Sequence, residues 1–153
     1  MRHPSIVVVA LLISISGFSQ EQQTKKYEVK VITSVESIIP SGLGRSRLIS
    51  SSEARDYKDF TSDRTEDSGR NKSKRSKIRV KNFEETKLLN FYNIGGIRFQ
   101  NIAANDAVVS SKLTDMLSQG WDLVFVTSAV ESDAGEKDGN GIFITRYIFK
   151  RQL

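Results

Sequence analysis

The sequence predicts an α+β domain in which one helix packs on one face of an antiparallel sheet of four or five strands. Apolar and polar residues alternate near both ends of the chain, one segment between them has helical spacing, and a long charged stretch interrupts the strands. The expected order is strand, long loop, two strands, helix and two strands. None of the 153 residues is cysteine, so the hydrophobic core has to stabilise this fold without disulfides.

The beginning of the chain has the pattern of a secretory signal peptide. Arg2 precedes an apolar run over residues 6–15, and small residues up to Ser19 precede the expected cleavage point. The alternative is a retained membrane anchor, but the run is shorter than the roughly 20 apolar residues that span a bilayer. We therefore expect a leader over residues 1–19 and one domain over residues 20–153, exported to the periplasm or secreted. Membrane contact is expected only through the leader before its cleavage.

The first strand is predicted over residues 27–36, where Val29 and Val31 alternate with charged side chains. Pro40 and the glycines after it end the strand. A charged segment over residues 50–77 follows and contains few large apolar side chains. Such a composition cannot offset the entropy of ordering, so this segment is predicted to be a flexible, disordered insertion.

The next two strands are predicted to form a hairpin. Ile78 and Val80 alternate with basic residues, residues 84–86 are expected to form a polar turn, and residues 88–92 provide the second strand. The glycines at 95–96 break that strand at a bulge or a bend.

A single helix is predicted over residues 106–119. Asn105 or Asp106 is a suitable N-cap, and Gly120 stands where a left-handed residue is favoured after a helix. Four apolar side chains share one face and are expected to cover the sheet: Val109, Leu113, Met116 and Leu117.

The last two strands are expected to form a long hairpin. Residues 121–130 are apolar on both faces after Asp122, which predicts a central strand with a neighbour on each side. Residues 142–150 alternate regularly and form the closing strand. The glycine-rich acidic segment over residues 131–141 joins the two strands.

Two elements are candidates for anion binding. In the GLGRSR segment the glycines let backbone amides approach an anion and the arginines can each donate two hydrogen bonds. Its spacing matches neither a P-loop nor a dinucleotide fingerprint, and the alternative is a turn before a short strand over residues 47–51, with the arginines paired to acids on neighbouring strands. The second element is a run of bases without acids over residues 70–81, whose alternative is a solvated loop leading into an edge strand. The candidates are Gly42, Gly44, Arg45, Ser46, Arg47, Arg70, Lys72, Lys74 and Arg75.

A weak pattern for a hard cation lies in the last hairpin. Glu136, Asp138 and Asn140 offer oxygen ligands at the spacing of a calcium loop. The closing glutamate is absent, because the twelfth position falls on Tyr147. A solvated hairpin loop is the better interpretation, and no metal site is predicted.

The inventory of reactive side chains argues against an enzyme. The single histidine, His3, lies in the predicted leader, so the mature chain holds no imidazole and no thiol for a triad, a cysteine nucleophile or a zinc site. No cofactor motif is present. Carboxylate-dependent hydrolysis stays open, although the acids occupy segments that look exposed. Loss of Arg2 from 23 bases leaves 22 against 18 acids, and this net charge of +4 does not indicate specific nucleic-acid binding.

The block GWDLVFV at residues 120–126, with a helix before it and ITRYIFKR at residues 144–151 after it, resembles a small bacterial domain family of unknown function. Residues 27–31 match the opening strand of that family, and Asp122 stands where its members usually have glutamate. The GLGRSR block at residues 42–47 further resembles exported Gram-negative proteins without an assigned activity. These resemblances imply a fold and export, and they supply no catalytic residues.

The sequence thus predicts an exported, non-catalytic binding or structural module of the periplasm or cell surface, with a protein or an anionic envelope component as partner. Strand addition at a sheet edge is the leading mode of binding. Electrostatic capture of an anionic envelope polymer by the GLGRSR turn and the basic run is the alternative. A carboxylate-dependent hydrolase is the third and least supported hypothesis.

Overall fold

The computed structural model describes residues 25–37, 46–66, 69–93, 95–131 and 141–153. Five antiparallel strands form one sheet in the order β3-β2-β1-β7-β6. One long helix, α3 (Phe99–Ser118), packs on it, so the predicted α+β fold is confirmed. The strands are β1 (Tyr27–Ser37), β2 (Arg47–Ser51), β3 (Phe83–Lys87), β6 (Asp122–Val130) and β7 (Ile142–Gln152). The predicted leader lies outside the described residues.

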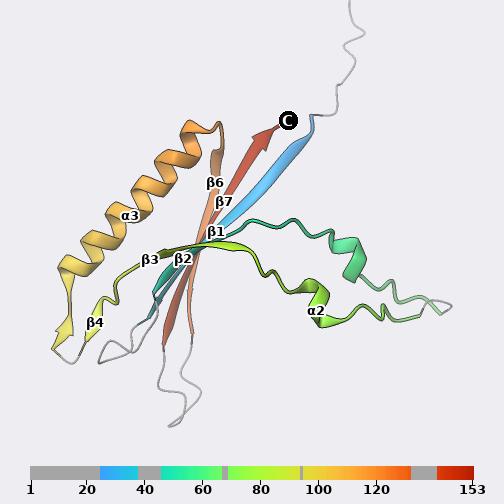
Figure 1. Cartoon of the computed structure of the whole chain (residues 1–153), viewed down its shortest axis with the longest axis horizontal. Coiled ribbons are helices and arrows are strands. Elements are labelled where there is room, and N and C mark those ends of the chain that lie inside the picture. Colours follow the sequence, from blue (N-terminus) through green and yellow to red (C-terminus); the bar gives the residue numbers. More distant parts are fainter. Residues whose placement is uncertain (1–24, 38–45, 67–68, 94, 132–140) are drawn as a thin grey trace, which may run out of the picture.

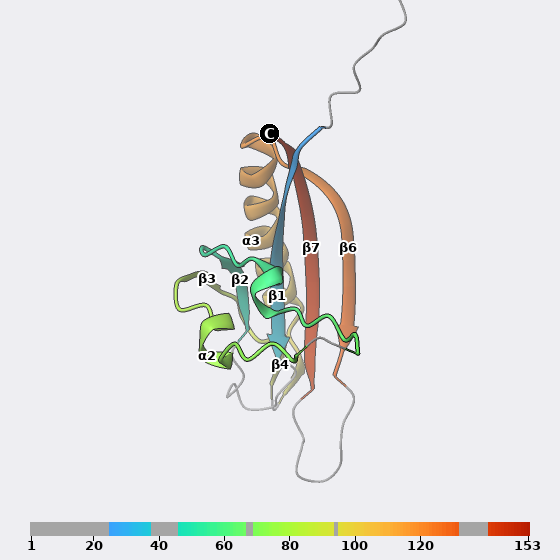
Figure 2. The same ribbon diagram turned by 90° about the vertical axis from the view of Figure 1, so that its right-hand side faces the viewer.

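The helix and the charged insertion lie on opposite sides of the sheet. In Figure 1, α3 lies on the left of the strands and the insertion extends to the right, and Figure 2 shows the insertion in front of the sheet with α3 behind it. We call the described residues 52–66 and 69–82 the arm, and the sheet surface on the side of the arm the open face. The arm contains a 3-10 turn, η2 (Tyr57–Phe60), and one turn of helix, α2 (Arg75–Ile78).

The hydrophobic core lies between α3 and the central strands. Strands β1 and β7 pair along their whole lengths, which places the even-numbered residues of β1 and the odd-numbered residues of β7 on the helix side. Phe149 and Ile32 are almost completely buried there, and Met116 reaches them from α3. The alternation that predicted these two strands is therefore the pattern of their burial.

Strand β6 lies at an edge of the sheet, and the prediction of a central strand is wrong. Among the described residues it pairs with β7 and has no strand on its other side. Its nine residues are all exposed, although Leu123 to Val130 carry no charge. Apolar composition predicted two neighbours, whereas the chain provides one.

The predicted hairpin over residues 78–92 is also wrong. Ile78 belongs to α2, and β3 occupies the residues that were predicted to form the turn. Strand β3 is a polar edge strand that pairs with β2. The Nζ atom of Lys112 on α3 lies 2.9 Å from Oε1 of Glu84. Tertiary pairing, rather than alternation of apolar residues, makes this segment a strand.

Helix α3 begins seven residues before the predicted start at 106, because Asn105 is an interior residue and not the N-cap. Arg98 is the N-cap and makes no capping hydrogen bond with its side chain. The predicted apolar face is only partly correct: Met116 is buried, but Leu117 is 54% exposed. Gly120 follows the helix with φ at +80°, as predicted.

The glycines before α3 form a small hairpin. Strand β4 (Tyr92–Asn93) pairs with β5 (Gly96–Ile97), and Gly96 has a φ of +95°, a conformation that favours glycine. The predicted bend at these glycines is therefore present, but the strand predicted before it over residues 88–92 is reduced to β4. The reversal brings the chain from β3 to the beginning of α3.

Candidate functional site

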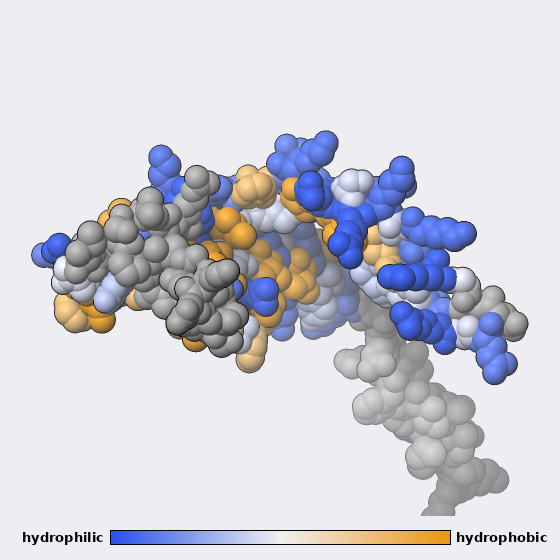
Figure 3. Space-filling model, turned by 90° about the horizontal axis from the view of Figure 1, so that it is seen from below, coloured by the Kyte–Doolittle hydropathy of each residue, from blue (hydrophilic) through white to orange (hydrophobic). Residues whose placement is uncertain are grey.

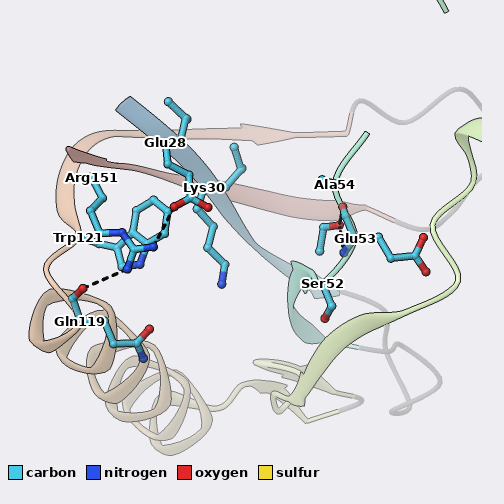
Figure 4. Close-up of a pocket in the computed structure, with 11 residues that line it drawn as sticks. Glu28, Lys30, Ser52, Glu53, Ala54, Gln119, Trp121 and Arg151 are labelled. Carbon is cyan, nitrogen blue, oxygen red and sulfur yellow. Dashed lines mark hydrogen bonds and ion pairs between the residues drawn. The ribbon is translucent and has the colours of Figure 1, made fainter. Parts of the chain in front are cut away.

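A cleft lies where the arm leaves the sheet. It has a volume of about 610 Å³ and opens between the end of α3, the beginning of β1 and the beginning of the arm (Figure 4). Trp121 and Arg151 lie at one end, and Ser52 and Glu53 lie at the other. Lys30 extends into the space between them.

Arg151 is held at its end of this cleft by three groups. Its guanidinium lies 4.4 Å from the centre of the Trp121 ring and donates to Glu28 Oε2 at 2.9 Å and to the carbonyl of Gln119 at 3.4 Å. Lys30, by contrast, makes no ion pair with a described residue. Of the two cations that line the cleft, Lys30 is thus the one without an ion pair to the described part of the chain, and it can bind a polar ligand.

Glu53 ties the two ends of the arm together. Its Oε1 accepts a hydrogen bond from the backbone N–H of Asn82 at 2.8 Å, and its other oxygen pairs with Arg55. The hydrogen bond from Asn82, and then the one from Arg55, hold the pKa of Glu53 below its ordinary value of 4.5. A carboxylate that stays ionised is a poor general acid, so this cleft does not favour the hydrolase hypothesis.

Acidification should loosen the ends of the arm. Because the folded pKa of Glu53 is lowered, its stabilising contribution is complete above pH 4.5 and is lost as the pH falls through the folded pKa. We expect the protection factor of the Asn82 amide in hydrogen exchange to stay level above pH 4.5 and to fall as the pH is lowered below that value. In Glu53→Gln this protection should be low and independent of pH. An unchanged pH dependence in that variant would assign the effect to another group.

The two described residues of the GLGRSR segment, Ser46 and Arg47, make contacts within the protein. The Ser46 hydroxyl is buried, accepts a hydrogen bond from the Ser37 N–H at 3.0 Å and donates to Asn90 Oδ1 at 2.7 Å. Arg47 pairs with Glu85 on β3 and donates to the Ser46 carbonyl at 2.7 Å. The alternative of a short strand over residues 47–51 is confirmed as β2. Gly42, Gly44 and Arg45 lie outside the described residues.

The basic run is placed apart from that segment. Arg70, Lys72, Lys74 and Arg75 are exposed on the arm and make no ion pair with a described residue. In Figure 1, α2 lies well out on the arm, whereas β2 lies in the sheet. The structure therefore does not join the described residues of the two elements into one site, and their role in anion binding stays a prediction.

No metal centre is found in the part of the chain that the structure describes, where no three histidines, cysteines or acids come together. The weak candidates Glu136, Asp138 and Asn140 lie outside the described residues. None of the described helices combines the length and the apolar character needed to cross a bilayer.

Two exposed apolar surfaces were not predicted from the sequence. One is the outer edge of β6, where Leu123 is 39%, Phe125 60% and Val130 58% exposed. The other is the open face, where Val29 is 63% exposed on β1. The apolar pattern of these strands is visible in the sequence, where it predicts burial within the chain.

Comparison with models of known protein families finds no match to this chain, and a search of curated proteins finds no match either.

Proposed function

We propose that this protein is an exported, non-catalytic binding module of the periplasm or cell surface that takes up an extended partner segment at the edge of β6. The observation that carries the proposal is the contrast between the composition of β6 and its position. The strand has nine residues, is uncharged after Asp122 and pairs on one side only among the described residues. The signal-peptide pattern predicted over residues 1–19 supports export.

The strand at the opposite edge of the sheet, β3, has the features that protect an edge against an added strand. Edge strands are usually protected against added strands by being short, charged or interrupted by proline. Strand β3 follows that rule, since its five residues are FEETK. Strand β6 is longer, has no proline and is uncharged after Asp122, and its register with β7 shifts only between Leu123 and Phe125. Beyond that shift, every second residue of the edge turns its N–H and C=O groups outward. These groups favour pairing with an incoming strand.

Side chains of β6 would add to the affinity. Leu123, Val126 and Val130 project on the helix side of the sheet, and Phe125 projects on the open face. Each is at least 39% exposed. Complete burial of such a side chain contributes about 1.5–3 kcal/mol, so partial burial of these four beneath a partner would contribute several kcal/mol.

Electrostatic capture of an anionic envelope polymer is the second candidate. Seven bases on the arm carry no acid among them and no ion pair with described residues: Arg70, Lys72, Lys74, Arg75, Lys77, Arg79 and Lys81. Such an interaction depends on long-range charge and is screened by salt. Strand addition depends on main-chain hydrogen bonds and apolar contacts, so ionic strength separates the two modes.

The test is affinity capture from envelope extract with the immobilised mature protein. We expect a partner that stays bound from about 0.05 M to about 1 M salt, where the screening length is about 3 Å. The double variant Val126→Lys with Val130→Lys places two charges at the edge and should lose this partner. Ala103→Lys with Ala107→Lys adds the same charge to exposed positions of α3 and should retain it.

Two results would count against strand addition. Retention of the partner by the β6 double variant would exclude the edge as its site. Release of all captured material at high salt would favour the polymer hypothesis instead.

A further inference from the structure

The open face carries an arginine, Arg146, between two apolar rows. The register places Val31, Ile148 and Phe125 side by side across β1, β7 and β6, and it places Val35, Ile144 and Ala129 in a parallel row. Between them runs the row of Ile49, Thr33, Arg146 and Thr127. Arg146 is exposed and makes no ion pair with a described residue.

An apolar pocket of about 360 Å³ lies on the same face at the root of the arm. Val31 and Ile49 of the sheet line one side, and Val80 and Phe83 line the other. Phe83 is 50% exposed and Val31 is 42% exposed, so a further side chain could still be buried against them. Thr33, which also lines the pocket, is the direct cross-strand neighbour of Arg146.

The arm places basic side chains beside this apolar surface. In Figure 3, hydrophobic side chains gather in the middle of the molecule, and the hydrophilic side chains of the arm stand to the right of them. Arg79 and Lys81 flank Val80 in the sequence, and both are exposed and without an ion pair to a described residue. The Arg55 side chain connects the two segments of the arm, because it donates hydrogen bonds to the carbonyls of Lys77 and Arg79, each at 3.2 Å.

The acids near this surface do not balance its bases. Glu85 lies on the open face beside Ile49, but it pairs with Arg47. Among the described residues, Arg146 and the bases at the root of the arm, Arg79 and Lys81, therefore have no acid as an ion-pair partner, and Glu53 at that root is paired with Arg55. A second copy of the chain is excluded as the occupant, because it would bring two basic surfaces together. A flat bilayer is excluded as well, because the projecting arm would keep it from contacting the sheet. The complementary occupant is a polypeptide that carries both carboxylates and apolar side chains.

We propose that the open face is a second docking surface, which binds an acidic polypeptide segment by seating one apolar side chain in the pocket of Val31, Ile49, Val80 and Phe83 and by pairing a carboxylate with Arg146. This surface lies beside the β6 edge and does not depend on strand addition there. Bases near the root of the arm, Arg79 and Lys81, contact further acids of the same segment.

The experiment uses fluorescence anisotropy with a labelled synthetic peptide of mixed glutamate and leucine, titrated with the full mature protein. We expect binding that Arg146→Gln weakens by about tenfold, because a charge-assisted hydrogen bond is lost. Val31→Thr keeps the β-branched shape but makes the pocket polar, and it should weaken binding about threefold. Arg98→Gln removes an exposed charge at the beginning of α3 and should leave the affinity unchanged. Circular dichroism establishes that each variant is folded.

Several outcomes would overturn the inference. Equal binding of a peptide with serine for leucine would show that charge alone attracts the ligand, and equal binding of a peptide with lysine for glutamate would exclude the ion pair. Absence of binding up to about 1 mM, or a stable dimer in light scattering that Arg146→Gln does not affect, would also contradict it. Loss of binding in Val126→Lys with Val130→Lys alone would move the peptide to the β6 edge, leaving strand addition intact and refuting the open face.

Discussion

Replacing Phe149 by alanine is expected to lower the free energy of unfolding by about 3–5 kcal/mol. Its side chain is 0% exposed, and β7 places it between β1 and β6 on the side covered by α3. It belongs to the same buried cluster as Met116 and Trp121. The substitution removes the ring and leaves a cavity that the paired strands cannot close by moving. This loss is comparable to the whole stability of a small domain, which is about 5–15 kcal/mol.

Urea denaturation followed by Trp121 fluorescence measures this loss. Leu123→Ala is the matched control, because Leu123 is the cross-strand neighbour of Phe149 on β6 but is 39% exposed. We expect the control to cost about 1 kcal/mol, since less surface is buried there. Similar costs for the two variants would contradict a core centred between α3 and β7.

Replacing Asn105 by alanine is expected to cost about 3 kcal/mol of stability, which is unusual for a polar residue of a helix. Asn105 is 3% exposed, and its amide pairs with both backbone groups of Leu89: Oδ1 accepts from the N–H at 2.8 Å, and Nδ2 donates to the carbonyl at 2.7 Å. Nδ2 also lies 3.1 Å from Glu36 Oε2. Alanine leaves two backbone groups without these partners, and each such loss costs about 1–3 kcal/mol where the group is buried.

Asn101→Ala is the control for this prediction. Asn101 lies one turn earlier on α3, and its side chain donates to the Asn90 carbonyl at 2.7 Å. Loss of one hydrogen bond predicts a cost of about 1 kcal/mol. The two variants are compared by thermal and urea denaturation. If Asn105→Ala were no more destabilising than Asn101→Ala, the double contact with Leu89 would not anchor α3 to the segment after β3.

The helix start shows why local patterns mislead at such positions. Asn105 has the composition of an N-cap, but its side chain bonds to a distant segment, so the helix continues through it to Phe99. The sequence around an asparagine does not show whether it caps a helix or bonds to a distant segment from inside one. Only the position of Leu89 distinguishes them.

The candidate sites were partly predictable. The basic run was recognised from charge alone, and the structure places its bases on an exposed arm. The sequence does not distinguish Arg146, because a single base in a strand has no distinctive pattern. Its significance arises from the apolar rows that neighbouring strands place on either side of it.

The sequence by itself determined the class of the fold, the strands β1 and β7, the position of Gly120 and the absence of imidazole and thiol chemistry after the predicted leader. These properties depend on residues close together in the chain or on composition. Tertiary structure decided that β3 is a strand, that α3 begins at Phe99 and that β6 lies at an edge. The physical reason is that periodicity reports which side chains are apolar, whereas pairing between distant segments decides which of them are covered.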